Sequence, residues 1–591
     1  MKRHSILRNT FFAQFIAFII SSLTQTIGSL IDGVVIGQFL GTESIAAFGI
    51  VNPLITTFSV FGAIVSTGSR TRYTRLIGEG KKKEAQSIFS LSCILSIGFA
   101  TVLMVIILPF ASPIAKVLGA SGNAANLLPK ATDYLIGIAI GLPAMNAMKT
   151  LSGYMAIDND RHLPAIASAV MTVTDVVLDL VVVFVFHGDT FEMGLATSIS
   201  YYAGVLVLLL HFFKKNTFLR FSVRNLKWKE TGGIIVHGLP SGVCRVSNTL
   251  RSTFMNMLLS VIASTAAIAA YSVHRQADSF LNPITLGMAE AVAVLAGVLV
   301  GEENRTKLKR LLLISVEATF AVTLGFALLM YLFAPQFSAL FIKDNPEALR
   351  MSVTAVRCYA IGMPFYGLNV IYQCYLQGIG NSRMSLIAGF LLEAGFLILS
   401  AGIMTNFIGA DAVWYAFPVT QVLMLIFYGV IIMVYSHRLR IRHRSLMDKI
   451  IVMPDHFGVP EDEEMEKSIY SMDDVMELSQ GIWDFCETHS CDEKRKFLLS
   501  LSVEELAGNI IKHGFSNDGK MHSIDVRIVK NGDDYTLCVR DDCPVFDPVK
   551  QLELFNDEDP SRHIGLRMIS NSAKDFQYNS FFKLNNLVIK I

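Results

Sequence analysis

Long apolar runs, separated by short polar connections, fill the chain from its start to about Val434. Each run has about 20 residues or more, enough for a helix to cross a hydrocarbon core roughly 30 Å thick. We therefore predict an all-α membrane protein with twelve spans. They cover approximately residues 11–37, 44–69, 86–109, 131–156, 163–186, 193–213, 232–260, 265–298, 308–333, 352–378, 384–407 and 412–436. After Tyr435 the pattern becomes that of a charged, soluble domain of roughly 150 residues.

The twelve predicted spans form two repeats of one six-span unit. The segment 76–88 recurs in altered form at 299–311, at an offset of 223 residues, and Gly-Leu-Pro at 141–143 recurs as Gly-Met-Pro at 362–364, at an offset of 221. A duplicated apolar array is typical of a secondary transporter. We therefore expect an N-terminal lobe of six spans over residues 1–222 and a C-terminal lobe of six spans over 223–440.

The distribution of charge predicts the orientation in the membrane. Only 17% of the residues are charged, against roughly 25% in soluble proteins, and the formal net charge is +1. Lysine and arginine gather in alternate loops, at 70–83, 214–229 and 438–449, whereas the intervening loops are poor in both. By the positive-inside rule the basic loops and both termini lie in the cytoplasm. We expect a multi-pass protein of the plasma (inner) membrane.

Three carboxylates interrupt the apolar spans of the first half: Asp32, Asp175 and Asp179. An ionisable residue inside a span costs roughly 2.5–3.5 kcal/mol on insertion scales, so each needs a role. Asp175 and Asp179 are four residues apart and share one helix face. Two carboxylates close together in low dielectric raise at least one pKa, which suits a group that takes up and releases a proton. The alternative interpretation is that these residues are buried hydrogen-bonding groups that hold helices together.

The second half carries charges of both signs inside its spans. They are Arg245 and Arg251 in the seventh span, Arg275, Asp278 and Glu290 in the eighth, Glu317 in the ninth and Glu393 in the eleventh. One interpretation is a set of internal ion pairs that stabilises the wall of a substrate cavity. The other is that Arg245, Arg251 or Arg275 contacts an anionic group on the substrate. The residues alone do not choose between the two.

Several segments of both halves are similar to the multidrug and toxic compound extrusion (MATE) family. They are Ile31 to Gly41, Ala46 to Pro53, Gly78 to Gly80, Gly194 to Thr197 and Gly238 to Ser241. The resemblance covers about residues 8–440. It implies two six-helix lobes that form a V around a central cavity, and export driven by a gradient of H⁺ or Na⁺. It also implies a site for the coupling ion at Asp32, Asp179 and Thr197, and Asp175 stands where the family commonly has asparagine.

The soluble tail is predicted to be an α+β sandwich that follows a linker. Residues 441–467 have the composition of a basic and then acidic linker, with a solvated acidic stretch at 461–466. Helical apolar spacing occurs at 468–489 and 494–513, and strand-like segments occur at 522–530, 535–541 and 586–591. In the domain over 468–591 we expect the helices to cover one face of a mixed sheet.

Three polar motifs follow one another in the tail. Glu505, Asn509 and His513 recur every fourth residue on one helix face, where they could polarise a water and hold Mg²⁺ at a triphosphate. The second motif, 540–548, directly follows a predicted strand, and the third, 563–569, opens a helix whose N-terminus could face phosphate. Each motif alone also fits an ordinary solvated surface.

Together and in this order the motifs resemble the GHKL ATPase fold, and most closely the bacterial anti-sigma-factor serine kinases. The resemblance spans about residues 468–591. It implies ATP and Mg²⁺ as ligands, Glu505 as general base and Asn509 as the Mg²⁺ ligand. It further implies that Asp541 accepts a hydrogen bond from the adenine amino group, that Gly565 belongs to the phosphate lid, and that His513 lies at the nucleotide.

The tail departs from this family at two glycine-rich motifs. The Asp-x-Gly-x-Gly box reads Asp-Asp-Cys-Pro-Val at 541–545, and the Gly-x-Gly of the lid reads His-Ile-Gly at 563–565. The missing glycines would let the backbone approach the nucleotide closely. The sequence contains no Gly-x-x-x-x-Gly-Lys-Ser/Thr loop, which argues against an ATP-binding-cassette pump.

The leading hypothesis is an antiporter that exports a small organic compound in exchange for H⁺ or Na⁺. Its tail would sense nucleotide or act as a serine kinase on a cytosolic signalling protein. The alternatives are a membrane receptor whose transporter-like body controls the tail, and a flippase for lipid-linked precursors that uses the arginines of the second half. We expect contact with membrane lipid and no nucleic-acid partner, and a homodimer if the tail pairs as related kinase modules do.

Overall fold

The computed structural model describes most of the chain. The described residues are 5–39, 41–118, 120, 126–214, 217–223, 226–262, 265–342, 345–439, 444–460, 462–515, 520–550 and 564–591. Within these ranges the side chains are described except at 29–30, 32–38, 41–43, 45–46, 49, 52–53, 56, 260–262, 265, 268 and 410.

The transporter body contains a helix, or a broken helix, at each of the twelve predicted spans. The N-terminal lobe consists of α1 (Ile6–Phe39), α2 (Gly41–Gly78), α3 (Lys82–Leu118), α4 (Leu128–Ala139), α5 (Leu142–Ile157), α6 (Leu163–Val181) with a π-helical turn (Val182–Phe186), and α7 (Thr190–Leu209). The C-terminal lobe consists of α8 (Thr231–Ile262), α9 (Thr265–Gly301), α10 (Arg305–Leu332), α11 (Ala334–Phe341), α12 (Pro346–Gly378), α13 (Ser382–Phe390) with a π-helical turn (Leu391–Gly395), α14 (Phe396–Ile408), α15 (Ala412–Arg438) and the short α16 (Leu446–Ile450).

Length and composition identify 8 of the described helices as able to cross a membrane, or 9 if the α4–α5 pair counts as one span. These two helices meet at a bend of 43°. The bend precedes Pro143, which cannot donate a backbone hydrogen bond to the preceding turn.

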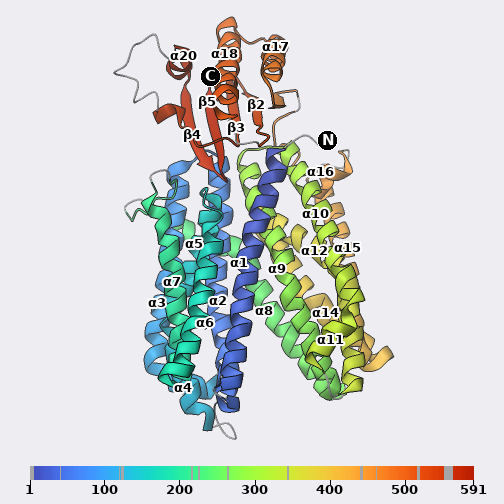
Figure 1. Ribbon diagram of the computed structural model, residues 1–591. Coiled ribbons are helices and arrows are strands. Elements are labelled where there is room, and N and C mark those ends of the chain that lie inside the picture. The colour runs from blue at the N-terminus through green and yellow to red at the C-terminus, as the bar shows by residue number, and fades with distance from the viewer. Residues whose placement is uncertain are drawn as a thin grey trace.

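The two lobes touch in the halves of their helices that lie nearer the tail. Figure 1 shows the N-terminal lobe (blue to cyan) and the C-terminal lobe (green to orange) converging beneath the tail and diverging away from it. Glycines permit this approach. A Cβ added to Gly68 would meet the Ile234 carbonyl oxygen at 1.9 Å, and one added to Gly78 would meet the Val298 carbonyl oxygen at 2.2 Å. The backbones of the two lobes are therefore in direct contact on the side of the tail.

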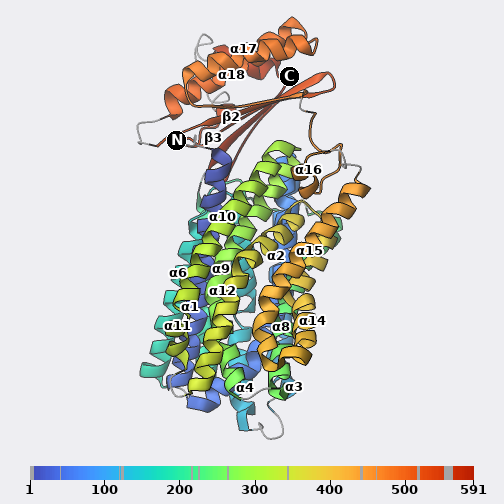
Figure 2. The ribbon, with the colours of Figure 1, turned by 90° about the vertical axis from the view of Figure 1, so that its right-hand side faces the viewer.

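The tail is a five-stranded sheet with helices on one face. The strands are β1 (Glu464–Ile469), β2 (Ile524–Asn531), β3 (Asp534–Asp541), β4 (Asp575–Phe581) and β5 (Leu584–Lys590), in the order β1-β2-β3-β5-β4. The helices are α17 (Met472–Thr488), α18 (Glu493–Asn509), which continues into a π-helical turn (Ile510–Gly514), and α20 (Ile564–Ser572). Figure 2 shows α17 and α18 on the face of the sheet that points away from the transporter body. The opposite face rests on the ends of both lobes.

Two expectations about the tail are wrong. Neighbouring strands are all antiparallel, and tight turns join β2 to β3 and β4 to β5. Residues 464–466 are not a solvated linker but the start of β1. Glu464 forms an ion pair with Arg527 at 2.6 Å and Glu466 with Lys307 at 2.5 Å, whereas Met465 packs against the core of the tail. The alternation of charged and apolar residues is that of a strand whose polar face is paired.

Candidate functional site

A buried pair of carboxylates lies on α6. Asp175 and Asp179 are one helical turn apart and buried, and Asp179 is completely enclosed. Neither carboxylate oxygen of Asp179 has a hydrogen-bond partner among the described residues. An isolated charge is costly to bury, so such a carboxylate is stable only when it binds a proton or a cation. The pair therefore has the chemistry of a coupling site.

The other residues predicted for this site lie on neighbouring helices. Thr197 is on α7, where its hydroxyl donates to the Met193 carbonyl oxygen at 3.3 Å. Asp32 belongs to α1, and its side chain lies outside the described residues. One apolar cluster joins these helices; its members are Ile31, Phe48, Leu178, Val182, Val183, Met193 and Ala196. The cluster thus contains the residues that precede Asp32, Asp179 and Thr197 in the sequence, namely Ile31, Leu178 and Ala196.

A second buried polar cluster lies in the C-terminal lobe. Arg251 forms ion pairs with Asp278 and Glu393, each at 3.4 Å. Tyr359 donates a hydrogen bond to Asp278 at 3.1 Å, and Tyr366 donates one to Glu393 at 3.0 Å. The guanidinium of Arg251 is therefore neutralised inside its own lobe, which is the arrangement of the ion-pair interpretation.

The other two predicted arginines have different surroundings. Nη1 of Arg275 on α9 is buried without a hydrogen-bond partner in the described part of the chain. Arg245 on α8 is exposed, and its side chain pairs with no described acid. It follows Gly242 by three residues on the same helix face. A Cβ added to Gly242 would meet Cδ1 of Ile64 at 2.6 Å, so this face is turned toward the N-terminal lobe.

Lys149 on α5 is a charged residue that the sequence analysis did not consider. On α5 it lies between Asn146, which contacts Gly62 of α2, and Gly153, which contacts Arg70, also of α2. The face that carries Lys149 is therefore the one that packs on α2. A lysine in the middle of an apolar helix needs a functional or structural reason. The position of Lys149 within an apolar run could therefore have identified it as a candidate from the sequence.

Two of the three residues predicted on the α18 face meet. Nδ2 of Asn509 donates to Oε1 of Glu505 at 3.0 Å. Gly565, near the start of α20, lies over Glu505, since an added Cβ would meet its Cδ at 2.6 Å. His513 falls in the π-helical turn, is exposed, and forms no hydrogen bond with a described residue. The wider π turn rotates it out of the line that regular helical spacing predicted.

Asp541 lies buried at the end of β3. Its Oδ1 accepts hydrogen bonds from the Cys543 amide at 2.9 Å and from the Asn585 side chain at 2.8 Å. Burial raises the pKa of the Asp541 carboxyl, although the hydrogen bonds from Asn585 and Cys543 act to lower it. The turn after β3 thus forms with cysteine at position 543, whose amide holds the Asp541 carboxylate.

The β4–β5 hairpin attaches the tail to the N-terminal lobe. The Phe582 amide donates to the Ile157 carbonyl oxygen at 2.8 Å, and the Lys583 amide donates to Oδ1 of Asn159 at 2.6 Å. Asn159 also donates from Nδ2 to the Ser580 carbonyl oxygen at 3.0 Å. It has a φ of +61°, in the left-handed region, where asparagine is among the best tolerated residues. The loop after α5 is therefore shaped to fit the hairpin.

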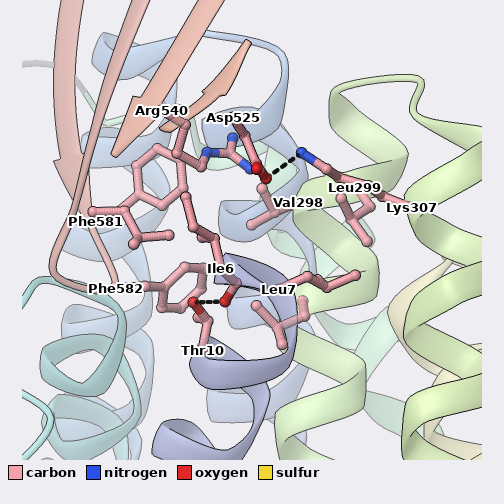
Figure 3. A pocket seen from close by; sticks show the side chains of 12 residues that line it. Ile6, Leu7, Thr10, Val298, Leu299, Lys307, Asp525, Arg540, Phe581 and Phe582 are labelled. Atoms are coloured by element: carbon pink, nitrogen blue, oxygen red, sulfur yellow. Dashed lines mark hydrogen bonds and ion pairs between the residues drawn. The ribbon is translucent and has the colours of Figure 1, made fainter. Parts of the chain in front are cut away.

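Ion pairs attach the same face of the sheet to the C-terminal lobe. Arg540 pairs with Glu302, and Lys307 pairs with Asp525 at 2.9 Å, as Figure 3 shows for the second pair. Arg527 donates to the backbone carbonyl of Glu302 at 2.7 Å. Although burial acts to raise it, the Lys307 ammonium holds the pKa of the Asp525 carboxyl below its usual value. The tail therefore contacts both lobes at once.

Figure 3 also shows the apolar junction where α1, α9 and the hairpin meet beneath the sheet. A gap of only about 20 Å³ remains there. Its apolar lining consists of Ile6, Leu7, Leu295, Val298, Leu299, Phe581, Phe582 and Leu584. The hairpin thus closes against the helix ends with little space for solvent.

Comparison with known proteins identifies relatives of the transporter body. The chain is similar to "Multidrug export protein MepA" of Staphylococcus haemolyticus (strain JCSC1435), with 25% identity over 399 residues, 64% of this chain and 86% of the relative. The protein of the same name from Staphylococcus aureus (strain N315) is 20% identical over 439 residues, which covers 73% of this chain and 95% of the relative.

Solved structures share the fold of the body. An outward-facing multidrug resistance MATE family transporter of the MOP superfamily gives a TM-score of 0.67 at 22% identity, over 71% of this chain and 94% of the other. A MATE structure in the bent conformation gives a TM-score of 0.67 at 22% identity, over 76% and 98%. At this level of identity the likeness shows the fold alone.

Family models match both parts of the chain. The histidine kinase-like ATPase domain matches residues 471–589, and the MatE family matches residues 17–181 and 240–399. The expected resemblances to the MATE family and to a histidine kinase-like ATPase domain are confirmed. Because the MatE match covers more than half of the sequence, the protein belongs to the MatE family of membrane transporters, with a histidine kinase-like ATPase domain after the transporter body.

Proposed function

We propose that this transporter is an antiporter of the plasma membrane that exports a small organic compound in exchange for H⁺ or Na⁺ bound at Asp179. The observation that carries the proposal is the enclosed carboxylate of Asp179, which has no hydrogen-bond partner in the described part of the chain. Asp175 adds a second negative charge one turn away, so the pair holds a proton or cation more tightly than one carboxylate would. Asp32 and Thr197 are the further ligands we propose.

The test is dye efflux from proteoliposomes under an imposed pH gradient and, separately, under a Na⁺ gradient. One anionic dye, carboxyfluorescein, and one cationic dye, ethidium, cover both signs of substrate charge. Asp179→Asn is expected to abolish gradient-driven efflux, because the amide neither takes up a proton nor carries the charge that attracts Na⁺. Asp133→Asn, at an exposed position of α4, is the control. Efflux at the parental rate in Asp179→Asn would remove the coupling role.

For the tail we propose that it binds ATP together with Mg²⁺ in the cytoplasm. Glu505 and Asn509 are held together by a hydrogen bond and present side-chain oxygens of the kind that Mg²⁺ prefers. Asp541 would accept a hydrogen bond from the adenine amino group, and Gly565 brings the start of α20 over Glu505. Bound ATP would supply a phosphoryl group for transfer to a serine of a cytosolic signalling protein.

Binding can be measured by titrating the purified full-length protein with ATP and Mg²⁺ in a calorimeter. Asn509→Ala is expected to lower the affinity roughly tenfold or more, since a charged or metal-linked hydrogen-bonding group is lost. Asn531→Ala, at the exposed last residue of β2, should bind like the parent. A folded protein that takes up no nucleotide would refute the proposal and leave the tail as a docking domain.

We also propose that the tail regulates the transporter. Arg540 and Asp541 are consecutive in β3, so their side chains point to opposite faces of the sheet. Arg540 pairs with Glu302 of the transporter body, whereas Asp541 lies on the side of the helices. We propose that nucleotide at Asp541 changes the contact between Arg540 and the body. Because the tail also contacts Asn159 of the other lobe, its attachment favours the state in which the tail-side ends of the lobes are closed.

The same contacts favour a second candidate function, a membrane receptor that signals through the tail. Coupling between two binding sites is reciprocal. If ATP changes the affinity of the body for its ligand by some factor, that ligand changes the affinity of the tail for ATP by the same factor. A ligand that alters ATP binding to the protein in detergent, but is not transported in proteoliposomes, would support the receptor over the exporter.

A further inference from the structure

Two basic residues from opposite lobes lack a partner among the described residues of the transporter body. Lys149 on α5 and Arg245 on α8 are near enough for their charges to interact. Arg245 is exposed and Lys149 is half-buried. Neither side chain forms an ion pair or hydrogen bond with a described residue. Among the described residues, neither basic group therefore has a carboxylate partner of its own.

Both side chains extend away from the tail, and Lys149 does so inside the N-terminal lobe. Lys149 lines a cavity of about 80 Å³ with the polar residues Gln25, Asn146 and Tyr201. Because Cβ atoms tilt toward the N-terminus of a helix, and α5 runs toward the tail, the Lys149 side chain extends away from the tail. Arg245 lies one turn beyond the contact of Gly242 with α2, also away from the tail. The glycine contacts between the lobes close the opposite side.

The charge around these cations is not balanced. Glu290 is the carboxylate whose field acts on Arg245, and it is already held by Arg70 at 2.9 Å across the boundary between the lobes. For the three basic side chains of this group, Lys149, Arg245 and Arg70, Glu290 is the one carboxylate that the described residues bring near. The contrast with Arg251 is clear, since two carboxylates accompany that guanidinium.

We infer that Lys149 and Arg245 bind an anionic group, a carboxylate or a phosphate, on the compound that the protein exports; this inference rests on the proposed function as an exporter. Two uncompensated like charges that lie close together repel each other. An anion between them removes that repulsion and accepts charge-assisted hydrogen bonds from both, with the planar guanidinium suited to bidentate contact. Since each lobe supplies one cation, the bound anion also joins the two lobes.

The experiment measures binding rather than transport. Purified full-length protein in detergent is titrated with carboxyfluorescein and with ethidium, and fluorescence anisotropy reports binding. Lys149→Gln and Arg245→Gln are each expected to weaken carboxyfluorescein binding roughly ten- to a hundredfold, the effect of losing a hydrogen bond to a charged group. Lys116→Gln, at an exposed position of α3, is the matched control. Lys149→Arg keeps the charge and is expected to retain binding, which excludes a general folding defect.

The source of the anion is distinguished by competition. Displacement of the dye by phosphatidylglycerol, but not by inorganic phosphate, assigns the anionic group to a lipid headgroup. Displacement by inorganic phosphate assigns it to a soluble compound. Tighter binding of ethidium than of carboxyfluorescein, or carboxyfluorescein binding unchanged in both glutamine variants, would overturn the inference.

Failure of the inference and failure of the proposed function give different results. If carboxyfluorescein binding depends on Lys149 and Arg245 but no gradient drives efflux, the anion site stands and the exporter proposal fails. If a gradient drives ethidium efflux at parental rates in Lys149→Gln and Arg245→Gln, the exporter proposal stands and the anion site is wrong.

Discussion

Arg540→Ala should release the tail from the transporter body without unfolding it. The side chains of Arg540 and Glu302 are only 14% and 15% exposed, and Arg540 is the described partner of the Glu302 carboxylate. Removing one member of a buried ion pair costs about 3–5 kcal/mol, because the other charge is left without a partner. Since both side chains keep some contact with water, we take the lower end of this range for the cost of losing Arg540. About 3 kcal/mol corresponds to a change of roughly 150-fold in the docking equilibrium.

Hydrogen exchange can measure this equilibrium at the contact itself. The Phe582 amide donates to the Ile157 carbonyl of the N-terminal lobe, so it exchanges only when the hairpin leaves that lobe. In Arg540→Ala we expect the exchange of peptides that contain Phe582 to accelerate roughly 100-fold. Amides in the core of the tail, such as Ile528, should keep their parental rates.

Two variants make the result decisive. Arg495→Ala removes an arginine that bonds only within the tail, to Asp533 and Asp492 among the described residues, and should leave Phe582 exchange unchanged. Glu302→Gln combined with Arg540→Ala should recover part of the loss, because no unpaired charge remains. Unchanged exchange at Phe582 in Arg540→Ala, or equal acceleration throughout the tail, would refute the reasoning.

Three further predictions concern lobe closure, nucleotide binding and the hairpin. Gly78→Val should separate the tail-side ends of the lobes and reduce efflux at least tenfold, since no side chain fits there; Gly98→Val, with nothing within 4 Å of its Cβ, should be harmless in the same efflux assay. Because the pKa of Asp541 is raised, its carboxylate takes up a proton at a higher pH than an ordinary aspartate. ATP affinity measured by calorimetry should therefore fall as the pH is lowered from about 7 to about 5, and Asp541→Asn should show no such slope. Asn159→Ala loses hydrogen bonds to the hairpin and strains the left-handed backbone, so it should accelerate hairpin exchange more than Asn159→Gly does; equal rates would show that the strain is negligible.

The spans were predictable because each apolar run is long enough to require a helix in the membrane. The environment of the charges inside them was not. Arg245 and Arg251 are six residues apart on α8, which corresponds to about 240° around the helix. One therefore faces the other lobe, and the other is enclosed by carboxylates of its own lobe. Sequence spacing gives this angle but not which face the neighbouring helices cover.

The sheet of the tail was predicted only where its pattern is that of a free-standing domain. Strands β2, β3 and β5 alternate or are continuously apolar and were expected, whereas β1 and β4 were not. In β1 the glutamates pair with Arg527 and Lys307, and in β4 Gln577 and Asn579 line the space above the transporter. These residues are polar because the face they occupy meets polar helix ends. In a sequence read by itself, such a face has the composition of a solvated loop.

The contact between Asn159 and the hairpin has a consequence for how the protein is made. Asn159 and Ser580 are separated by 421 residues, which a ribosome adds in roughly 20–80 s at 5–20 residues per second. During this interval the loop after α5 must keep its shape without its partner. Asp158 can hold that shape, because its carboxylate accepts hydrogen bonds from the Phe218 and Leu219 amides. Its Oδ2 also lies 2.8 Å from Nε2 of His211. The N-terminal lobe is thus a template that exists before the hairpin is synthesised, and the tail takes its place on a surface already folded.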